Sequence, residues 1–385
     1  MKSGKVFENS CCYGCGVTLR KKNSSKEHII PNAIGGRLKS RKLLCKDCNS
    51  AFGSDIDFKL TQQLSFLCNL LNIKRDDGEV PKTIKPTDGD YNLRAGGKPV
   101  PKKPSIEEID LDNGMRQISV HASPEQAESI FKGLQRKYNL SDELIAEAKA
   151  SAQLREEYVS DSLNFPVEFG GSDAFRSICK TAVSFFVHRG GNPCAIQHLV
   201  PYIRGERDKH CTFFYYPVQS ITKREPTEIL HTIIVAGDET AGVLYAYIEY
   251  FSCYSCIVLL NDAYRGASFV ETYFFDTLQS KEVNKSFNIS ISLDELNALL
   301  DNRQTSQQDI QRAFAMALGI ALNKIKKATI HDIVEKTFDD SFETFPEGQI
   351  MDEEMFRLFL EKFQERFAPF LAAQMSTRDE NFGEF

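Results

Sequence analysis

The chain has 385 residues, of which 42% are hydrophobic and 26% are charged, a balance typical of a soluble globular protein and not of collagen-like, coiled-coil or wholly disordered chains. The net charge of −6 is unevenly spread, because residues 1–60 hold 12 Lys and Arg against 5 Asp and Glu. A basic head of +7 therefore precedes an acidic remainder of −13, and an acidic partner such as nucleic acid would meet the head first.

No uncharged apolar run reaches the roughly 18 residues of a membrane helix. The N-terminal stretch MKSGKVFENSCC lacks the apolar core of a secretory signal. We therefore expect no membrane partner and a cytoplasmic, reducing location. Five of the 11 cysteines fall within residues 11–48, and clustered cysteines in a reducing compartment bind metal more often than they form disulfides.

Helix-breaking residues and hydrophobic periodicity predict the first elements of the chain. Residues 1–50 are short, basic segments broken by Gly and Cys. A single helix is predicted over 56–71, because apolar residues recur there at three- and four-residue steps. The members of this stripe are Ile56, Leu60, Leu64, Leu67, Cys68 and Leu71. The Pro-, Gly- and Asp-rich stretch from Lys74 to Pro104 then predicts turns, or a linker with short strands.

Three helices are predicted next, from a cap at Ser123 to about Tyr138, from Ser141 to about Val159, and over 173–187. Aromatic and β-branched runs between 211 and 275 indicate strands separated by turns. From Leu293 the pattern returns to helix, with helical periodicity over 305–326 and 350–372.

The fold class expected from this order is α+β. A small zinc-stapled module precedes a larger mixed domain with a central antiparallel sheet and helices. We expect the module to occupy residues 1–75 and a turn-rich connection to occupy 76–110. The domain over 111–385 has no recognised function and would select substrate, regulate or assemble.

Two CxxC pairs carry the clearest chemical signal. They are Cys12 with Cys15 and Cys45 with Cys48. Two intervening residues let both sulfurs of a pair reach one ion, and two such pairs complete a tetrahedral Cys₄ zinc site. A closed shell of four thiolates indicates a structural zinc, which a module this small needs for stability. Cys11 could replace Cys12, but the spacing would then be CxxxC.

Between the pairs lies the only histidine of this segment, His28, preceded by Glu27 and followed by Pro31 and a Gly-Gly turn. With a CxxCG start, an EHIIPNAIGG centre and a CxxCN end, residues 12–57 resemble the HNH, or ββα-metal, endonuclease family. The resemblance covers about an eighth of the chain. It implies that the module is a ββα-metal nuclease domain.

The resemblance also implies roles for individual residues. His28 matches the general base, while Glu27 and Asn49 match the residues that hold a catalytic divalent metal, Mg²⁺ or Mn²⁺. Two positions depart from the family pattern: Ser40 stands where Asn is usual, and Phe52 stands where His or Lys is frequent. Asp55 or Asp57, in the next helical turn, could supply the missing ligand.

These roles agree with the chemistry of phosphodiester hydrolysis. A neutral histidine near its ordinary pKa of about 6.5 can accept a proton from water at cellular pH. Carboxylate and amide oxygens suit Mg²⁺, which can stabilise the leaving oxygen. Neighbours on a regular strand point to opposite faces, so Glu27 and His28 share a site only if the strand twists or ends there.

Clustered cations favour a substrate rich in phosphate, because Lys and Arg contact backbone phosphates without reading sequence. The cluster comprises Arg20, Lys21, Lys22, Lys26, Arg37, Lys39, Arg41, Lys42 and Lys46. We therefore predict a metal-dependent HNH endonuclease that hydrolyses DNA, most naturally double-stranded DNA, in antiviral defence or restriction. A homodimer or a partner protein would be required to cut both strands with single sites.

Two alternatives stay open at this point. The module could bind nucleic acid through its zinc fold without cleaving it, with Ser40 and Phe52 marking a decayed site. The chain could also be an effector subunit that is activated by a partner or a signalling nucleotide.

Other candidate ligands are interpreted as structural. Cys253 and Cys256 form a third CxxC, but they lie in an aromatic, strand-like run without a second pair, which favours core packing. His231 precedes a similar run, and we interpret it as packed or edge-exposed.

Overall fold

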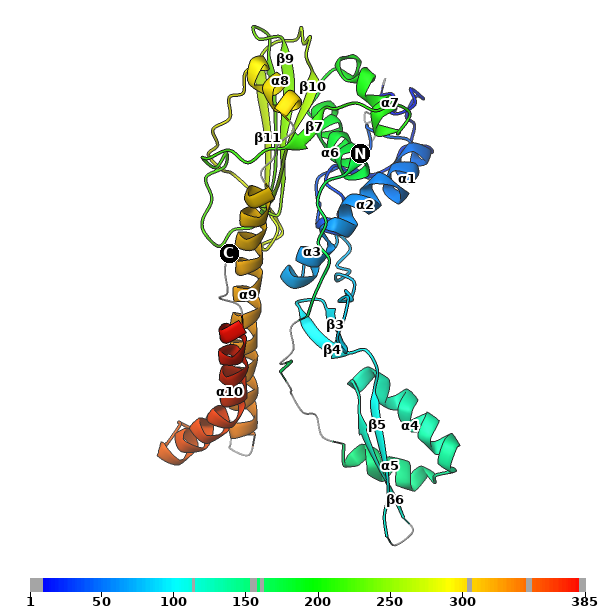
Figure 1. Cartoon of the computed structure of the whole chain (residues 1–385), viewed down its shortest axis with the longest axis vertical. Helices are drawn as coiled ribbons and strands as arrows, with labels where there is room; N and C mark the ends of the chain where they lie inside the picture. Colours follow the sequence, from blue (N-terminus) through cyan, green and yellow to red (C-terminus); the bar gives the residue numbers. More distant parts are fainter. Residues whose placement is uncertain are drawn as a thin grey trace. The chain divides into compact units, whose positions relative to one another are not determined.

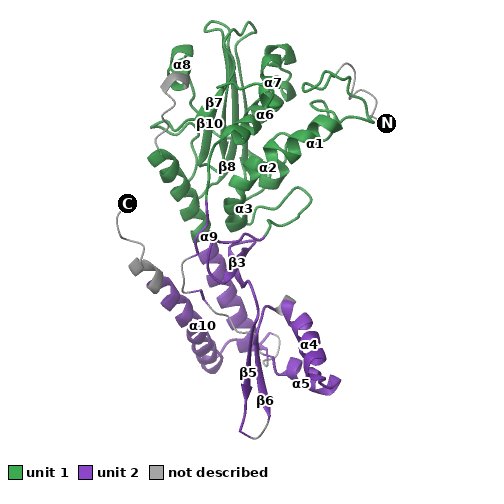
Figure 2. Ribbon diagram, turned by 45° about the vertical axis from the view of Figure 1, so that its right-hand side comes forward, with its two compact units in different colours: residues 1–82, 167–324 green, residues 83–166, 325–385 purple. Residues whose placement is uncertain are grey.

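The computed structural model describes residues 10–112, 115–152, 158–159, 163–302, 307–343 and 348–380. Two compact units account for the chain (Figure 2). Unit 1 contains Met1–Lys82 and Val167–Lys324, and unit 2 contains Thr83–Pro166 and Ile325–Phe385. Each unit thus joins two segments distant in sequence, and the expected domain limits at 75 and 110 stay a prediction. Within the described ranges, no helix is long and apolar enough to cross a membrane.

A six-stranded antiparallel sheet forms the centre of unit 1, in the order β12-β11-β8-β9-β10-β7. The strands are β7 (Thr212–Phe214), β8 (Leu230–Asp238), β9 (Val243–Tyr250), β10 (Tyr254–Asn261), β11 (Phe269–Asp276) and β12 (Lys281–Val283). Every residue of β9 is buried, because both faces of the central strands are covered. The α+β class and the antiparallel sheet expected from the sequence are confirmed.

Helix α6 (Ser172–His188) contacts the sheet and also contacts helix α2 of the N-terminal segment (Figure 1). Its apolar residues Ile178, Ala182 and Phe185 are fully buried, as the predicted helix over 173–187 requires. Its polar residues Ser177, Lys180, Thr181 and Ser184 are buried too, which makes α6 a central element with neighbours on most sides. Two 3₁₀ turns (Pro193–Ala195 and Gln197–Leu199) and α7 (Val200–Ile203) follow it.

The N-terminal module consists of a two-residue hairpin ladder and three short helices. The hairpin pairs β1 (Glu27–His28) with β2 (Lys39–Ser40), and a 3₁₀ turn (Asn32–Ile34) lies between them. The helices are α1 (Lys46–Ser54), α2 (Ile56–Gln63) and α3 (Ser65–Leu71). The predicted single helix over 56–71 is wrong in one respect, because it divides at Leu64. Leu64 keeps right-handed helical backbone angles, so both pieces retain one buried apolar stripe.

Unit 2 contains two hairpins and helices from both of its segments. The hairpins pair β3 (Tyr91–Arg94) with β4 (Lys98–Pro101) and β5 (Ser105–Asp110) with β6 (Arg116–His121). The helices are α4 (Pro124–Tyr138), α5 (Asp142–Ala150), the part of α9 (Gln307–Phe342) beyond Lys324, and α10 (Glu353–Glu380). Helix α8 (Leu293–Asn302) and the start of α9 belong to unit 1.

Two predicted helix ends were wrong. Helix α5 stops at Ala150 instead of continuing to about Val159, and residues 153–157 of that interval lie outside the described residues. Helix α9 continues past 326 to Phe342, where few apolar positions are buried and the periodicity is weak. In this extension the Phe342 ring stacks on Phe359 of α10, and nothing in the sequence of α9 predicts that contact.

Candidate functional site

Four cysteine sulfurs converge in the N-terminal module. The Sγ atoms of Cys12, Cys15, Cys45 and Cys48 all lie within 4.8 Å of one another. Those of Cys15 and Cys45 are 3.8 Å apart, and the Cys48 amide donates to the Cys45 Sγ at 3.4 Å. These four thiols fit a tetrahedral structural zinc. Cys11 is exposed and lies outside the cluster, so the CxxC spacing selected the correct residue of the pair.

The local backbone explains why the sulfurs meet. The Gly16 amide donates to the Cys12 carbonyl at 2.7 Å, which closes the first knuckle. A Cβ on Gly14 would lie 3.2 Å from the Cys48 Sγ, so a side chain there would crowd the cysteine cluster. Cys45 is the N-cap of α1, and the helix start therefore orients the second knuckle.

His28 lies on β1, half-buried, with its Nε2 atom 3.6 Å from Asp76 Oδ2. Lys39 is its partner in the β1–β2 ladder and forms an ion pair with the same Asp76. Burial and the Lys39 ammonium lower the pKa of His28 below its ordinary value, and Asp76 opposes them. The imidazole is therefore neutral at cellular pH, which is the protonation state that a general base needs.

Asp76 is a site residue that sequence reasoning missed. It lies in the turn Lys74–Gly78, which the sequence indicated only as part of a linker. The Asp76 amide donates to Asn32 Oδ1 at 2.8 Å, and Arg37 donates to the Lys74 carbonyl at 2.8 Å. These contacts bring the turn against the hairpin, and the only local signal for them is the charged DDG sequence.

Glu27 points away from His28, as alternation along a strand requires. Its carboxylate is only 3% exposed and forms an ion pair with Lys180 of α6. The Lys180 ammonium also lies 2.6 Å from Asp57 Oδ2, so one ammonium serves two carboxylates. Burial raises the pKa of Glu27, against the attraction of Lys180. Burial lowers the pKa of Lys180, but Asp57 and Glu27 outweigh it and keep the pKa above its ordinary value.

Lys180 belongs to a polar stripe on α6 at positions i, i+3, i+4 and i+7, each 1% exposed or less. The members are Ser177, Lys180, Thr181 and Ser184. The Ser177 hydroxyl donates to Asp57 Oδ1 at 2.6 Å, and the Ser184 and Tyr13 hydroxyls lie 2.9 Å apart. Ser177, Lys180 and Ser184 therefore hold β1, α2 and the first zinc knuckle, whereas Thr181 contacts Tyr250 of β9. Sequence reasoning did not find this stripe, because nothing in residues 172–188 suggests a link to the module.

The remaining predicted residues have separate partners. The side-chain amide of Asn49 donates through Nδ2 to the Ser25 hydroxyl at 2.6 Å. Ser40 accepts from the Lys42 amide at 3.2 Å, a contact that supports the loop after β2. Phe52 is buried in the module core. Among the described contacts, none joins Glu27, His28 and Asn49 to one another.

The turn that follows β1 is held by the central sheet. His231 of β8 is fully buried, and its Nε2 atom donates to the Ile34 carbonyl at 2.8 Å while Nδ1 accepts from the Phe251 amide. Burial lowers the pKa of His231 to about 4, so the ring is neutral. A Cβ on Gly36 would lie 1.9 Å from the Ile30 carbonyl oxygen, which explains the need for glycine beside this turn.

Cations gather on the exposed surface of the hairpin and of α1. Seven are exposed: Arg20, Lys21, Lys22, Lys26, Arg41, Lys42 and Lys46. Contact with Lys39 lowers the pKa of Lys26, a sign that positive charge is crowded here. Such a field attracts phosphate groups and increases their local concentration.

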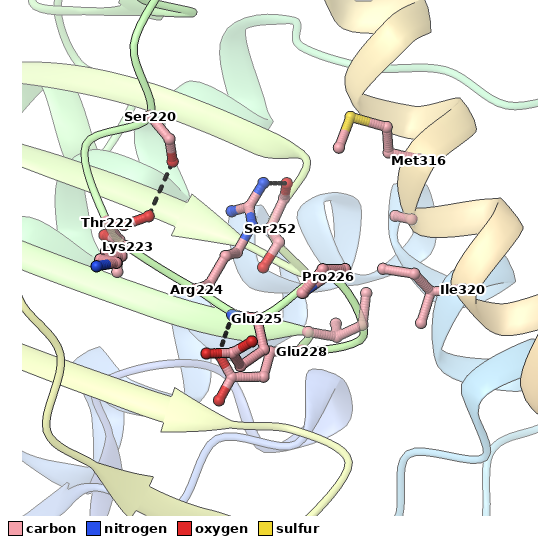
Figure 3. Close-up of a pocket in the computed structure, with 12 residues that line it drawn as sticks. Ser220, Thr222, Lys223, Arg224, Glu225, Pro226, Glu228, Ser252, Met316 and Ile320 are labelled. Carbon is pink, nitrogen blue, oxygen red and sulfur yellow. Dashed lines mark hydrogen bonds between the residues drawn. The ribbon is translucent and has the colours of Figure 1, made fainter.

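A pocket of about 500 Å³ opens elsewhere in unit 1, between residues 220–229 and the first part of α9 (Figure 3). Met316 and Ile320 project into it from α9, opposite Arg224. The Arg224 guanidinium donates to Glu249 Oε1 at 3.0 Å and to the Ser252 carbonyl at 3.2 Å. The protein itself therefore occupies the Arg224 guanidinium, while Lys223 also lines the pocket.

Comparison with known proteins identifies the module. The family described as HNH endonuclease matches residues 12–65, which span both zinc knuckles, β1, β2, α1 and α2. The resemblance in the CxxC pairs and the EHIIPNAIGG segment is therefore confirmed by a family match over residues 12–65. No curated protein and no solved structure matches the chain.

Proposed function

We propose that this protein is an endonuclease that hydrolyses phosphodiester bonds in DNA, with His28 as the general base. The observation that carries the proposal is the half-buried, neutral imidazole of His28 within a matched HNH domain, beside a cluster of exposed cations. Phosphate attraction and a general base are two of the properties that hydrolysis of a phosphate ester requires, and stabilisation of the leaving oxygen is a third.

His28 would remove a proton from the attacking water. Asp76, 3.6 Å from Nε2, stabilises the imidazolium that forms, while burial and then Lys39 lower the pKa of the resting ring. The exposed cations hold the substrate backbone against the hairpin without reading its sequence. Substrate choice would then depend on residues outside 12–65.

Metal ligation by Glu27 and Asn49 remains part of the proposal. Their carboxylate and amide oxygens are the ligand types that Mg²⁺ and Mn²⁺ accept, and a bound ion would stabilise the leaving oxygen. Glu27 directs Oε1 at Lys180, and Asn49 uses its amide nitrogen on Ser25. An ion would therefore have to meet Oε2 of Glu27 and the amide oxygen of Asn49.

Nicking of supercoiled plasmid in Mg²⁺ or Mn²⁺ tests the proposal. His28→Ala should lower kcat by about 10²–10⁴-fold, the usual contribution of a general base, while zinc content is unchanged. His210→Ala, at an exposed position of unit 1, is the matched control and should nick like the wild type. Equal nicking by wild type and His28→Ala would remove His28 from the mechanism.

A second function, DNA binding without cleavage, is favoured by one observation. Glu27, the expected metal ligand, is buried in an ion pair with Lys180. A gel-shift measurement beside the nicking assay separates the two functions. Salt-dependent binding without nicking in Mg²⁺, Mn²⁺ or Zn²⁺ would support the binding module.

The finer features of the proposal concern substrate and setting. We propose double-stranded DNA as substrate, with a second copy or a partner protein supplying the site for the second strand. Linear and supercoiled DNA, single strands and RNA compared in one assay would test this preference. A role in antiviral defence or restriction would appear as reduced plaque formation that depends on His28.

A further inference from the structure

Lys180 is the least expected charge in the described part of the molecule. It lies in the middle of α6, outside the matched residues 12–65, and its side chain is 2% exposed. A buried ammonium is costly unless carboxylates pair with it. Here Glu27 of β1 and Asp57 of α2 do so, and no described contact connects Lys180 to solvent or to the cation cluster.

The strand that Lys180 contacts has little support of its own. Strand β1 is two residues long and pairs with a β2 of the same length. Because neighbours on a strand point to opposite faces, the direction of Glu27 determines the direction of His28. Holding Glu27 against α6 therefore holds the imidazole on the outer face, near Asp76 and Lys39.

We infer that Lys180 is a positioning residue for His28: it fixes strand β1 to α6 through Glu27, and α2 through Asp57, without touching the substrate. The kinetic part of this inference rests on the proposed nuclease function. The HNH domain of this protein then depends on a helix encoded more than a hundred residues away, and residues 12–65 alone would not hold the base in place.

Kinetics of the full-length protein test the inference first. Lys180→Met should lower kcat on the order of 10²-fold, the effect expected of a misplaced catalytic group, with KM for plasmid within about twofold. KM should not move, because a buried side chain makes no contact with DNA. Thr181→Val is the matched control: Thr181 is the adjacent buried stripe residue, but its hydroxyl bonds Tyr250 of β9 at 2.9 Å. It should retain wild-type kcat.

A double-mutant cycle tests whether Lys180 acts through Glu27. The readout is amide exchange in residues 26–40 and not kcat, because Glu27 is also a proposed metal ligand. Glu27→Gln and Lys180→Met together should speed this exchange little more than the more severe single change, because both break one link. Independent contributions would instead multiply, and that result would overturn the inference.

Hydrogen–deuterium exchange gives a readout that needs no cleavage. Lys180→Met should speed exchange of the backbone amides in residues 26–40, whereas Thr181→Val should leave them at wild-type rates. If Lys180→Met fails to fold, the exchange is measured on Glu27→Gln instead. That variant leaves Lys180 in an ion pair with Asp57, which has no net charge. Unchanged exchange in 26–40 in a folded variant overturns the inference, even if the wild type nicks DNA. A wild type that does not nick refutes the nuclease function, and the exchange result then decides the role of Lys180 by itself.

Discussion

Two regions support the strand that carries His28, and they differ in how the chain builds them. On one side, four cysteines within residues 12–48 form the zinc cluster. On the other, Lys180 and its neighbours on α6 reach Glu27, Asp57 and Tyr13 from a distant segment. The α6 residues are buried, whereas Cys15 of the cluster is exposed, and only the cluster follows from a local sequence spacing.

The difference teaches how the N-terminal module is integrated in this chain. A zinc staple makes a small module self-contained, because metal binding supplies the stability that a small core lacks. The α6 stripe instead makes the module part of unit 1, since buried polar groups must find their partners there. The following variants separate these two kinds of support.

Loss of the zinc cluster should have the largest effect. Cys48→Ser removes one of four ligands, and structural zinc sites contribute on the order of 10 kcal/mol to folding. We expect zinc content to fall from about one ion per chain to none, and the module to lose exchange protection. Cys11→Ser is the control, since Cys11 lies outside the cluster. Zinc retained by Cys48→Ser, measured by atomic absorption, would contradict the Cys₄ assignment.

Loss of the α6 ion pair should have a smaller effect on stability. Removing one partner of a buried pair costs about 3–5 kcal/mol, so Lys180→Met should lower the free energy of unfolding by that amount. Thr181→Val removes only a neutral hydrogen bond and should cost about 1 kcal/mol. Urea denaturation measures both. A loss for Lys180→Met no greater than for Thr181→Val would mean that the ion pair adds little to stability.

The contact of His231 with the turn after β1 should give a weaker, pH-dependent effect. Its pKa is lowered from 6.5 to about 4 in the folded protein. As pH falls through 6.5, the unfolded chain takes a proton that the folded chain refuses, so stability decreases. At pH 5 the loss should reach about 2 kcal/mol, measured by urea denaturation at several pH values.

His231→Gln should flatten this pH dependence, because it removes the titrating ring. His210→Gln, at an exposed position, is its control. A pH slope that His231→Gln leaves intact would assign the acid sensitivity to other groups.

Much of the fold was predictable where the signal is local. The strands between 211 and 275 and the helix over 173–187 follow from aromatic and apolar patterns, and the structure contains them. The ends of α5 and α9 were wrong, because one helix lacks a strong stop signal and the other lies against α10. For the candidate site, alternation along β1 set the condition under which Glu27 and His28 could share a site, but the sequence did not indicate what either side chain would face.

By itself, the sequence indicated the four clustered cysteines, a candidate base and the resemblance of residues 12–65 to HNH endonucleases, because spacing between nearby residues sets which side chains can share an ion or a turn. Tertiary structure alone decided that Asp76 meets His28 and that Lys180 meets Glu27 and Asp57. Those partners depend on how α6 and the turn Lys74–Gly78 pack on the hairpin. A buried charge pairs with a counterion that tertiary packing places beside it, so no pattern in the local sequence predicts the pair.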